Sequence, residues 1–297
     1  MRTNINLPLY HIDHFIFPFI EGSFICKNGK YLDGFFLVDS GSSDNVFNKE
    51  AMHLLSEDSI KSDKRHLYAI NNEGEECEQA NVKIKIGNIE CIEPFSISHN
   101  LDFKGMFGDN NIIGVLGARF MHLYGLVLDY AQRCVRSSEL NDFSGAGKAF
   151  VCPMLAGFKT YGIPLVCLTN GEDDVLCVAD SGSNINTLTK YAMEKAACSY
   201  KHIAGQKSMH TISGESITDL AKVDFSLLSV KGKDNDTICH LVSDSDVFQI
   251  ITEHEHICWS NDEEIPPISG LISSEFMLRN KWVLDFNVGF IYVDDAA

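Results

Sequence analysis

The chain has 297 residues, 45% of them hydrophobic, and its 41 acidic residues against 24 Lys and Arg residues give a net charge of −17. This charge repels phosphate backbones and anionic lipid surfaces, so we expect no nucleic acid and no membrane as partners. The sequence contains no run of eighteen apolar residues, which argues against a membrane-spanning helix and favours a globular chain.

The first distinctive segment, residues 35–47, reads FFLVDSGSSDNVF. Four apolar residues lead into Asp39, and the turn that follows begins with Ser40, Gly41 and Ser42. An aspartate at the end of an apolar strand is costly to bury unless its carboxylate is hydrogen-bonded or neutralised. One such motif is also compatible with an ordinary turn, because Asp, Ser and Gly are common turn residues.

Alternating apolar and polar residues dominate the rest of the chain. Residues 81–97, NVKIKIGNIECIEPFSI, alternate on both sides of a Gly-Asn pair and predict a β-hairpin. Residues 221–230 carry a similar pattern. Short helical turns are expected at residues 49–56 and 190–197, and after each of the two Phe-Met pairs. We therefore predict a mostly β protein.

The aspartate motif occurs twice in the chain. Residues 175–189, VLCVADSGSNINTLT, again run from an apolar strand into Asp180, followed by Ser181, Gly182 and Ser183. The tripeptide DSG is weak evidence when it stands alone. Its second copy, placed about half a chain length after the first, indicates an internal repeat.

A second pair of matching segments supports this repeat. GVLGARFMHLYGLVLDY at 114–130 aligns without a gap on GLISSEFMLRNKWVLDF at 270–286. The two segments share Phe-Met and Val-Leu-Asp at matching places, and a polar, Gly-rich stretch separates the repeats. We predict an N-terminal lobe at 1–140 with the first motif, a linker at 141–150, and a C-terminal lobe at 151–297 with the second.

Both motifs resemble those of the aspartic peptidases, pepsin-like and retropepsin-like, in which two similar β lobes each supply an aspartate from an apolar-apolar-Asp-Thr/Ser-Gly-Ser/Ala turn. LVDSGSSDNVF and VADSGSNINTL match this form. VLGARFMHLYGLVLD is similar to the family's apolar-apolar-Gly strand behind the catalytic loop, and LISSEFMLRNKWVLD departs from it only at Ser273, where the family has Gly. The resemblance covers nearly the whole chain. It implies an all-β, two-lobed aspartic-protease-like fold, with two similar β-barrel lobes and a central cleft.

The resemblance further implies that Asp39 and Asp180 form a catalytic dyad at the floor of the cleft. Two carboxyl groups about 3 Å apart do not both ionise, so such a pair shares one proton. The ionised member acts as general base on a water molecule while the protonated member polarises the scissile carbonyl. The sequence does not assign the proton to either aspartate.

The residues that follow each aspartate acquire supporting roles in this resemblance: Ser40, Gly41, Ser42, Ser181, Gly182 and Ser183. The glycines allow a tight turn whose N–H groups face the carboxylates. The last serine of each motif is expected to hydrogen-bond the outer carboxylate oxygen, and the first to reach across and hold the two loops together. For each serine taken alone, turn chemistry is an equal alternative.

A flap, which is a β-hairpin that closes over the substrate, is also implied by the resemblance. The candidates are residues 67–76 and 209–216, because Gly74 and Gly214 lie at comparable distances after the two aspartates. Tyr68 lies in the first candidate, and pepsin-like flaps usually carry a tyrosine. The alternative is that both segments are surface hairpins without a ligand.

One further cluster of chemically active residues is the segment EHEHIC, which contains His254, His256 and Cys258. On an extended strand these side chains face the same way and are types that bind zinc. One face of one strand rarely supplies a whole ligand set, so we favour an exposed loop and expect no metal site.

We therefore expect an aspartic endopeptidase that hydrolyses peptide bonds without a metal or organic cofactor and acts as a monomer on peptide or protein substrates. The alternative is a catalytically inactive peptide-binding module on the same fold, although neither aspartate nor its glycine is replaced. No secretory signal is recognisable, and the ten cysteines are scattered without a CxxC pair. These features favour reduced thiols and a cytoplasmic location.

Overall fold

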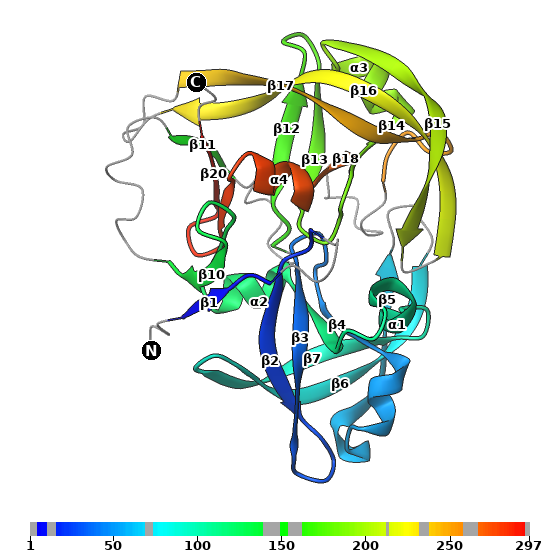
Figure 1. Ribbon diagram of the computed structural model, residues 1–297, viewed down its shortest axis with the longest axis vertical. Helices are drawn as coiled ribbons and strands as arrows, with labels where there is room; N and C mark the ends of the chain where they lie inside the picture. Colours follow the sequence, from blue (N-terminus) through cyan, green and yellow to red (C-terminus); the bar gives the residue numbers. More distant parts are fainter. Residues whose placement is uncertain are drawn as a thin grey trace.

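A computed structural model of the protein describes residues 5–10, 16–68, 74–138, 149–153, 162–211, 214–231, 238–257 and 267–294. The described chain is mostly β with short helices, which confirms the all-β class predicted from the alternating pattern. Figure 1 shows two β regions, one above the other in the view, with the early strands below and the late strands above.

The first region is a seven-stranded sheet whose strands are β2 (Phe19–Ile25), β3 (Tyr31–Asp39), β4 (Asn45–Asn48), β5 (Ile60–Tyr68), β6 (Gly74–Ile86), β7 (Ile89–Ser98) and β8 (Ile112–Gly117). The order β2-β3-β8-β4-β7-β6 closes on itself, because β2 also pairs with β6. These six strands form a closed barrel, and β5 extends it beyond β6.

The strands of the second region are β12 (Leu165–Thr169), β13 (Asp174–Asp180), β14 (Asn186–Thr189), β15 (Ser199–Thr211), β16 (Gly214–Lys231), β17 (Ile238–Ile251) and β18 (Ile268–Ser273). They repeat the pairing pattern of the first region: β12-β13-β18-β14-β17 in order, with β16 paired to both β12 and β17, and β15 to β16. The same arrangement of strands therefore surrounds each DSG motif.

Six further strands continue the sheet of the second region beyond β16: β1 (Asn6–Pro8), β9 (Leu126–Asp129), β10 (Cys134–Ser137), β11 (Ala149–Pro153), β19 (Val283–Asp285) and β20 (Phe290–Asp294). Their order is β1-β10-β9-β19-β20-β11, and the antiparallel pair β9–β19 joins the two Val-Leu-Asp segments. The predicted linker at 141–150 lies mostly outside the described residues, and its last two residues begin β11.

The helices are all short: η1 (Lys49–His53), η2 (Glu57–Ser59), α1 (Phe103–Phe107), α2 (Ala118–Leu123), α3 (Lys190–Ala196) and α4 (Ser274–Arg279). The helical turns predicted at 49–56 and 190–197 are confirmed by η1 and α3. The prediction of helices after the Phe-Met pairs was wrong in position. Helices α2 and α4 contain these pairs, because the Phe and Met side chains are buried and form the inner face of each helix.

The strand interiors bury aromatic and branched side chains. In the first barrel Phe47 and Phe95 stack with ring centroids 4.0 Å apart, and Phe36 packs beside them. The hairpin predicted at 81–97 is confirmed, since β6 and β7 pair from Ile86 to Ile89 around a turn in which Gly87 has a φ of +56°. None of the helices in the described part of the chain is both long and apolar enough to span a bilayer.

Candidate active site

The two DSG aspartates are the last residues of two equivalent strands, β3 and β13. Each of these strands runs parallel to one neighbour: β3 pairs with β8, and β13 with β18. As a result Asp39 lies opposite Gly117, and Asp180 lies opposite Ser273. Both parallel pairs also contain a register shift at the same place, before Phe36 and before Cys177 respectively. The repeat in the sequence thus corresponds to a repeat of backbone structure around each aspartate.

Reciprocal hydrogen bonds between Ser40 and Ser181 join the two loops. The Ser40 hydroxyl donates to the Ala179 carbonyl (2.6 Å) and accepts from the Ser181 N–H (2.9 Å). The Ser181 hydroxyl donates to the Val38 carbonyl (2.7 Å) and accepts from the Ser40 N–H (2.7 Å). Both serines are completely buried. These four bonds bring residues 141 positions apart into direct contact, as the sequence analysis expected of these two serines.

Backbone N–H groups of the turns point at the carboxyl groups. Asp39 Oδ1 accepts from the N–H groups of Gly41 (2.9 Å) and Ser42 (3.0 Å), and Asp180 Oδ1 accepts from that of Gly182 (2.8 Å). A Cβ atom on Gly41 would overlap the carboxyl group of Asp180, and one on Gly182 would overlap that of Asp39. Each loop therefore needs glycine because the opposite aspartate lies against its backbone.

The two carboxyl groups contact each other, and their burial changes their acidity. Burial raises the pKa of Asp39, against the opposing effect of its hydrogen bonds with Asp180 and the backbone. Burial also raises the pKa of Asp180, and the negative charge of Asp39 raises it further. Asp180 is 8% exposed, whereas Asp39 is partly exposed. Both effects favour the protonated form, so the pair retains a proton more readily than isolated aspartates do.

The hydroxyl groups of Ser42 and Ser183 do not bond the aspartates, so this expectation was wrong. Ser42 Oγ donates to the Asp44 carbonyl (2.8 Å), and Ser183 Oγ donates to the Ile185 carbonyl (2.9 Å). A serine hydroxyl has one proton, and here the local turn accepts it. Ser42 still contributes to the site through its backbone N–H.

Two asparagines that the sequence analysis did not single out support the aspartate loops from behind. The Asn45 side-chain oxygen accepts from the N–H of Gly117 (3.0 Å), and that of Asn186 accepts from the N–H of Ser273 (2.8 Å). Both asparagines are buried. They stand at the same distance after the two aspartates, which is the signal in the sequence that would have revealed them.

Ser273, which stands where the resembled aspartic peptidases have glycine, keeps the backbone arrangement of its counterpart Gly117. A Cβ on Gly117 would overlap the backbone carbonyl of Asp44. Ser273 has space for its side chain, and its hydroxyl accepts from the Phe276 N–H (3.3 Å) and caps α4. In the first half this position lies against the backbone of Asp44, whereas in the second half its side chain caps α4.

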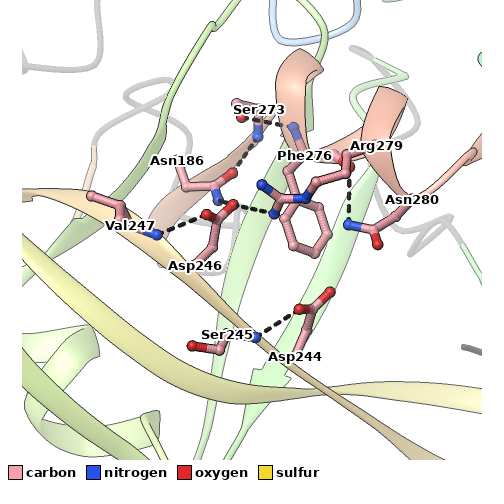
Figure 2. A network of polar contacts seen from close by, with 9 residues as sticks. All are labelled: Asn186, Asp244, Ser245, Asp246, Val247, Ser273, Phe276, Arg279 and Asn280. Carbon is pink, nitrogen blue, oxygen red and sulfur yellow. Dashed lines mark hydrogen bonds and ion pairs between the residues drawn. The ribbon is translucent and has the colours of Figure 1, made fainter.

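A polar network extends from Ser273 towards the surface of the second half (Figure 2). The Asn186 amide donates to Asp246 Oδ2 (2.8 Å), and the guanidinium of Arg279 donates to the same oxygen (2.7 Å). In the first half, the Asn45 amide donates instead to the Pro94 carbonyl (3.3 Å). The side-chain oxygens of Asn45 and Asn186 therefore make matching hydrogen bonds in the two halves, but their amide groups donate to different acceptors.

The two flap candidates form the ends of long hairpins. Strands β5 and β6 pair up to Tyr68 opposite Gly74, and strands β15 and β16 pair up to Thr211 opposite Gly214. Both hairpins lie at the right of the view in Figure 1. The tips of both hairpins and the side chain of Tyr68 lie outside the part of the chain that the structure describes. That these hairpins close over the aspartates as flaps stays a prediction.

The segment with His254 and His256 shows no sign of a metal site where it is described. His256 Nδ1 shares a hydrogen bond with Ser269 Oγ (2.9 Å), and its ring meets that of Tyr191 edge-on. Cys258 lies outside the described residues. Across the described ranges, no three His, Cys, Asp or Glu side chains are grouped as ligands of one ion.

No model of a known protein family matches the chain, and no curated protein is similar to it. Function is therefore inferred from the paired aspartates and from the loops that hold them. The recurrence of both features in the two halves separates this site from an ordinary pair of turns.

Proposed function

We propose that the protein is an aspartic endopeptidase with an aspartic-protease-like, two-lobed fold, in which the lobes at 1–140 and 151–297 each supply one catalytic aspartate. The observation that carries the proposal is the contact between the carboxyl groups of Asp39 and Asp180, which leave equivalent strands in equivalent turns. Both lobes belong to one chain, so a monomer suffices to complete the site.

Asp39 is assigned as the general base and Asp180 as the general acid. Asp39 accepts two backbone hydrogen bonds and is the more exposed residue of the two, and both features favour its ionised form. Asp180 accepts one hydrogen bond from its own turn, is more buried, and has its pKa raised by the charge of Asp39. The first proton to leave the pair is therefore the one on Asp39.

Peptide hydrolysis then proceeds by proton transfers between these two groups and the substrate. A water molecule held between the carboxyls attacks the peptide carbonyl carbon and transfers a proton to Asp39, while Asp180 donates its proton to the carbonyl oxygen. In the second step Asp39 protonates the amide nitrogen, the C–N bond breaks, and one hydroxyl of the intermediate returns a proton to Asp180. The pair ends with one proton, as it began.

Several cysteines whose side chains the structure describes form no disulfide: Cys26, Cys77, Cys91, Cys134, Cys177 and Cys198. Free thiols are the usual state in a reducing compartment. This observation supports the proposal of a cytoplasmic location. The proposed substrates are peptides or proteins.

The proposal is tested with the variants Asp39→Asn and Asp180→Asn, incubated with a diverse peptide mixture between pH 3 and pH 7. New termini are read by mass spectrometry. The matched controls are Asp33→Asn and Asp174→Asn, which change exposed aspartates on the same two strands. Cleavage by the parent and both controls, lost in both dyad variants, is the expected result. A folded parent that cleaves nothing while binding peptides would instead support the inactive peptide-binding module.

A further inference from the structure

A buried tyrosine lies between the two halves. Tyr130 follows strand β9, is 1% exposed, and has its hydroxyl oxygen 2.8 Å from Oγ of Ser274, the first residue of α4. Ser274 Oγ in turn donates to the carbonyl of Ile16 (2.8 Å). Because a serine hydroxyl has one proton, Tyr130 is the donor to Ser274. The three residues form a chain of hydrogen bonds that starts in the first half at Tyr130, crosses to Ser274 in the second, and returns to the first at Ile16.

This tyrosine also lies against the aspartate loops. Ser274, which accepts from the phenol, donates its backbone N–H to the carbonyl of Ser183 in the second loop (2.8 Å). The phenol is also close enough to sense the charges of Asp180 and Asp39. Burial raises the pKa of Tyr130, and both aspartates raise it further. The phenol therefore stays neutral and acts as a hydrogen-bond donor throughout the pH range in which the aspartates titrate.

The repeat shows that this polar pair is present on one side only. The gap-free alignment of 114–130 with 270–286 places Phe286 at the position of Tyr130 and Ala118 at the position of Ser274. Phe286 and Ala118 are also buried. Burying hydroxyl groups is more costly than burying Phe and Ala unless each hydroxyl finds a partner. The fold thus accepts apolar residues at these positions, so folding alone does not require the Tyr130–Ser274 pair.

We propose that Tyr130 is a positioning residue which, through Ser274, fixes the separation of the two aspartate loops and keeps Asp39 and Asp180 sharing one proton. This inference rests on the proposed peptidase function for its catalytic consequence. Its structural content, the spacing of the two carboxyl groups, is independent of catalysis.

The distance between the two carboxyl groups determines the difference between the two apparent pKa values of the pair. Two closely held carboxyls titrate in two macroscopic steps, and weaker interaction brings these steps together. The titratable groups that the structure places against the dyad are the opposite carboxyl and the Tyr130 phenol. Loosening the loops should therefore narrow the pH range in which the pair holds a single proton.

The test uses Tyr130→Phe, Ser274→Ala and the double variant, which install the residues found at the matching positions of the other half. The control is Tyr124→Phe, whose hydroxyl donates to Glu93 (2.6 Å) and not to the aspartate loops. Two quantities are measured: the pH profile of kcat/KM, and the titration of the Asp39 and Asp180 carboxyl carbons by NMR, assigned with the Asp→Asn variants. The NMR titration does not require a substrate.

The expected result is a loss of roughly tenfold in kcat/KM and a smaller gap between the two apparent pKa values in Tyr130→Phe, with the double variant no worse than the single ones. Tyr124→Phe should match the parent. If the difference between the two apparent pKa values is unchanged in folded Tyr130→Phe and Ser274→Ala proteins, the inference is overturned, even where the parent is a peptidase. A narrowed gap in a parent that cleaves nothing would support the inference while the proposed function fails.

Discussion

Asn45 and Asn186 hold equivalent places in the two halves, since the side-chain oxygen of each accepts from the N–H of the residue paired with a DSG aspartate, at 3.0 Å and 2.8 Å respectively. In both halves the next N–H, that of Ala118 or Ser274, donates at 2.8 Å to the carbonyl of the last serine of the motif. The aspartate loops are therefore attached to the strands behind them by one side-chain bond and one backbone bond each.

Removing these asparagines should destabilise the fold. In Asn45→Ala and Asn186→Ala, the N–H groups of Gly117 and Ser273 remain buried without their acceptor, which costs roughly 1–3 kcal/mol. Urea unfolding measures the free energy of each variant. The control is Asn28→Ala in an exposed turn, where the loss should be smaller. Equal losses for the buried and exposed asparagines would contradict this account.

In the network of Figure 2, Asp246 should contribute more than Arg279 to the free energy of unfolding. The side chain of Asp246 is 18% exposed and accepts from both Asn186 and Arg279, whereas the Arg279 side chain is 50% exposed. Arg279→Ala removes a partly solvated ion pair and should cost less than about 1 kcal/mol. Asp246→Ala leaves the buried amide of Asn186 without its acceptor and should cost more. The free energy of unfolding of both variants checks this order, and the reverse order would disprove it.

The features that the sequence predicted correctly are short-range patterns. The period of two identified the strands, and the Gly-Asn pair between Ile86 and Ile89 identified the hairpin turn. The repeated DSG turn identified the residues that the structure brings together, because Ser40 and Ser181 bond each other across 141 positions. Repetition supplied the long-range information here, since two copies of one unit indicate two equivalent sites.

The features that the sequence missed depend on distances that no local pattern encodes. Asn45 bonds Gly117 across 72 positions, and an asparagine in a turn is ordinarily read as a turn residue. The opposite error was made at Ser42 and Ser183, which were expected to contact the aspartates but bond carbonyls two residues further on. Whether a hydroxyl turns inward or satisfies its own turn is decided by packing in three dimensions.

The reciprocal serine bonds should respond to mutation as one unit. Ser40→Ala and Ser181→Ala each remove one buried donor and leave a backbone N–H unpaired, so each should cost roughly 1–3 kcal/mol. The double variant should lose less than the sum, because the two hydroxyls belong to one network. Ser40→Thr, which keeps the hydroxyl, serves as the control and should retain most of the stability. Additive losses in thermal unfolding would show that the two serines act separately.

Glycine at position 41 should be required for the site and not for the fold as a whole. A methyl group there would overlap the carboxyl of Asp180, so Gly41→Ala must push the two loops apart. We expect loss of most peptidase activity, by roughly a hundredfold for a displacement of about 1 Å. Gly29→Ala is the control: its φ of +77° makes alanine strained, but no atom lies within 4 Å of the added Cβ. It should lose about 1 kcal/mol of stability and keep its activity.

The raised pKa values of the dyad also predict how stability depends on pH. A carboxyl whose pKa is higher in the folded than in the unfolded state binds protons more tightly when folded, so its contribution to stability is lost as the pH rises from the unfolded value, about 3.9, through the folded one. Asp180→Asn removes this titration and mimics the protonated carboxyl.

The variant Asp180→Asn should therefore melt several degrees above the parent at pH 7, and the difference should disappear below about pH 4, where the parent carboxyl is protonated in both states. Calorimetry of the parent, Asp180→Asn and the control Asp174→Asn, an exposed aspartate on the same strand, measures this difference across the range. A parent that gains stability relative to Asp180→Asn between pH 4 and pH 7 would mean that Asp180 is ionised and stabilising in the folded protein. The assignment of Asp180 as the proton-bearing acid would then be wrong, because a stabilising charge at this position requires a lowered pKa.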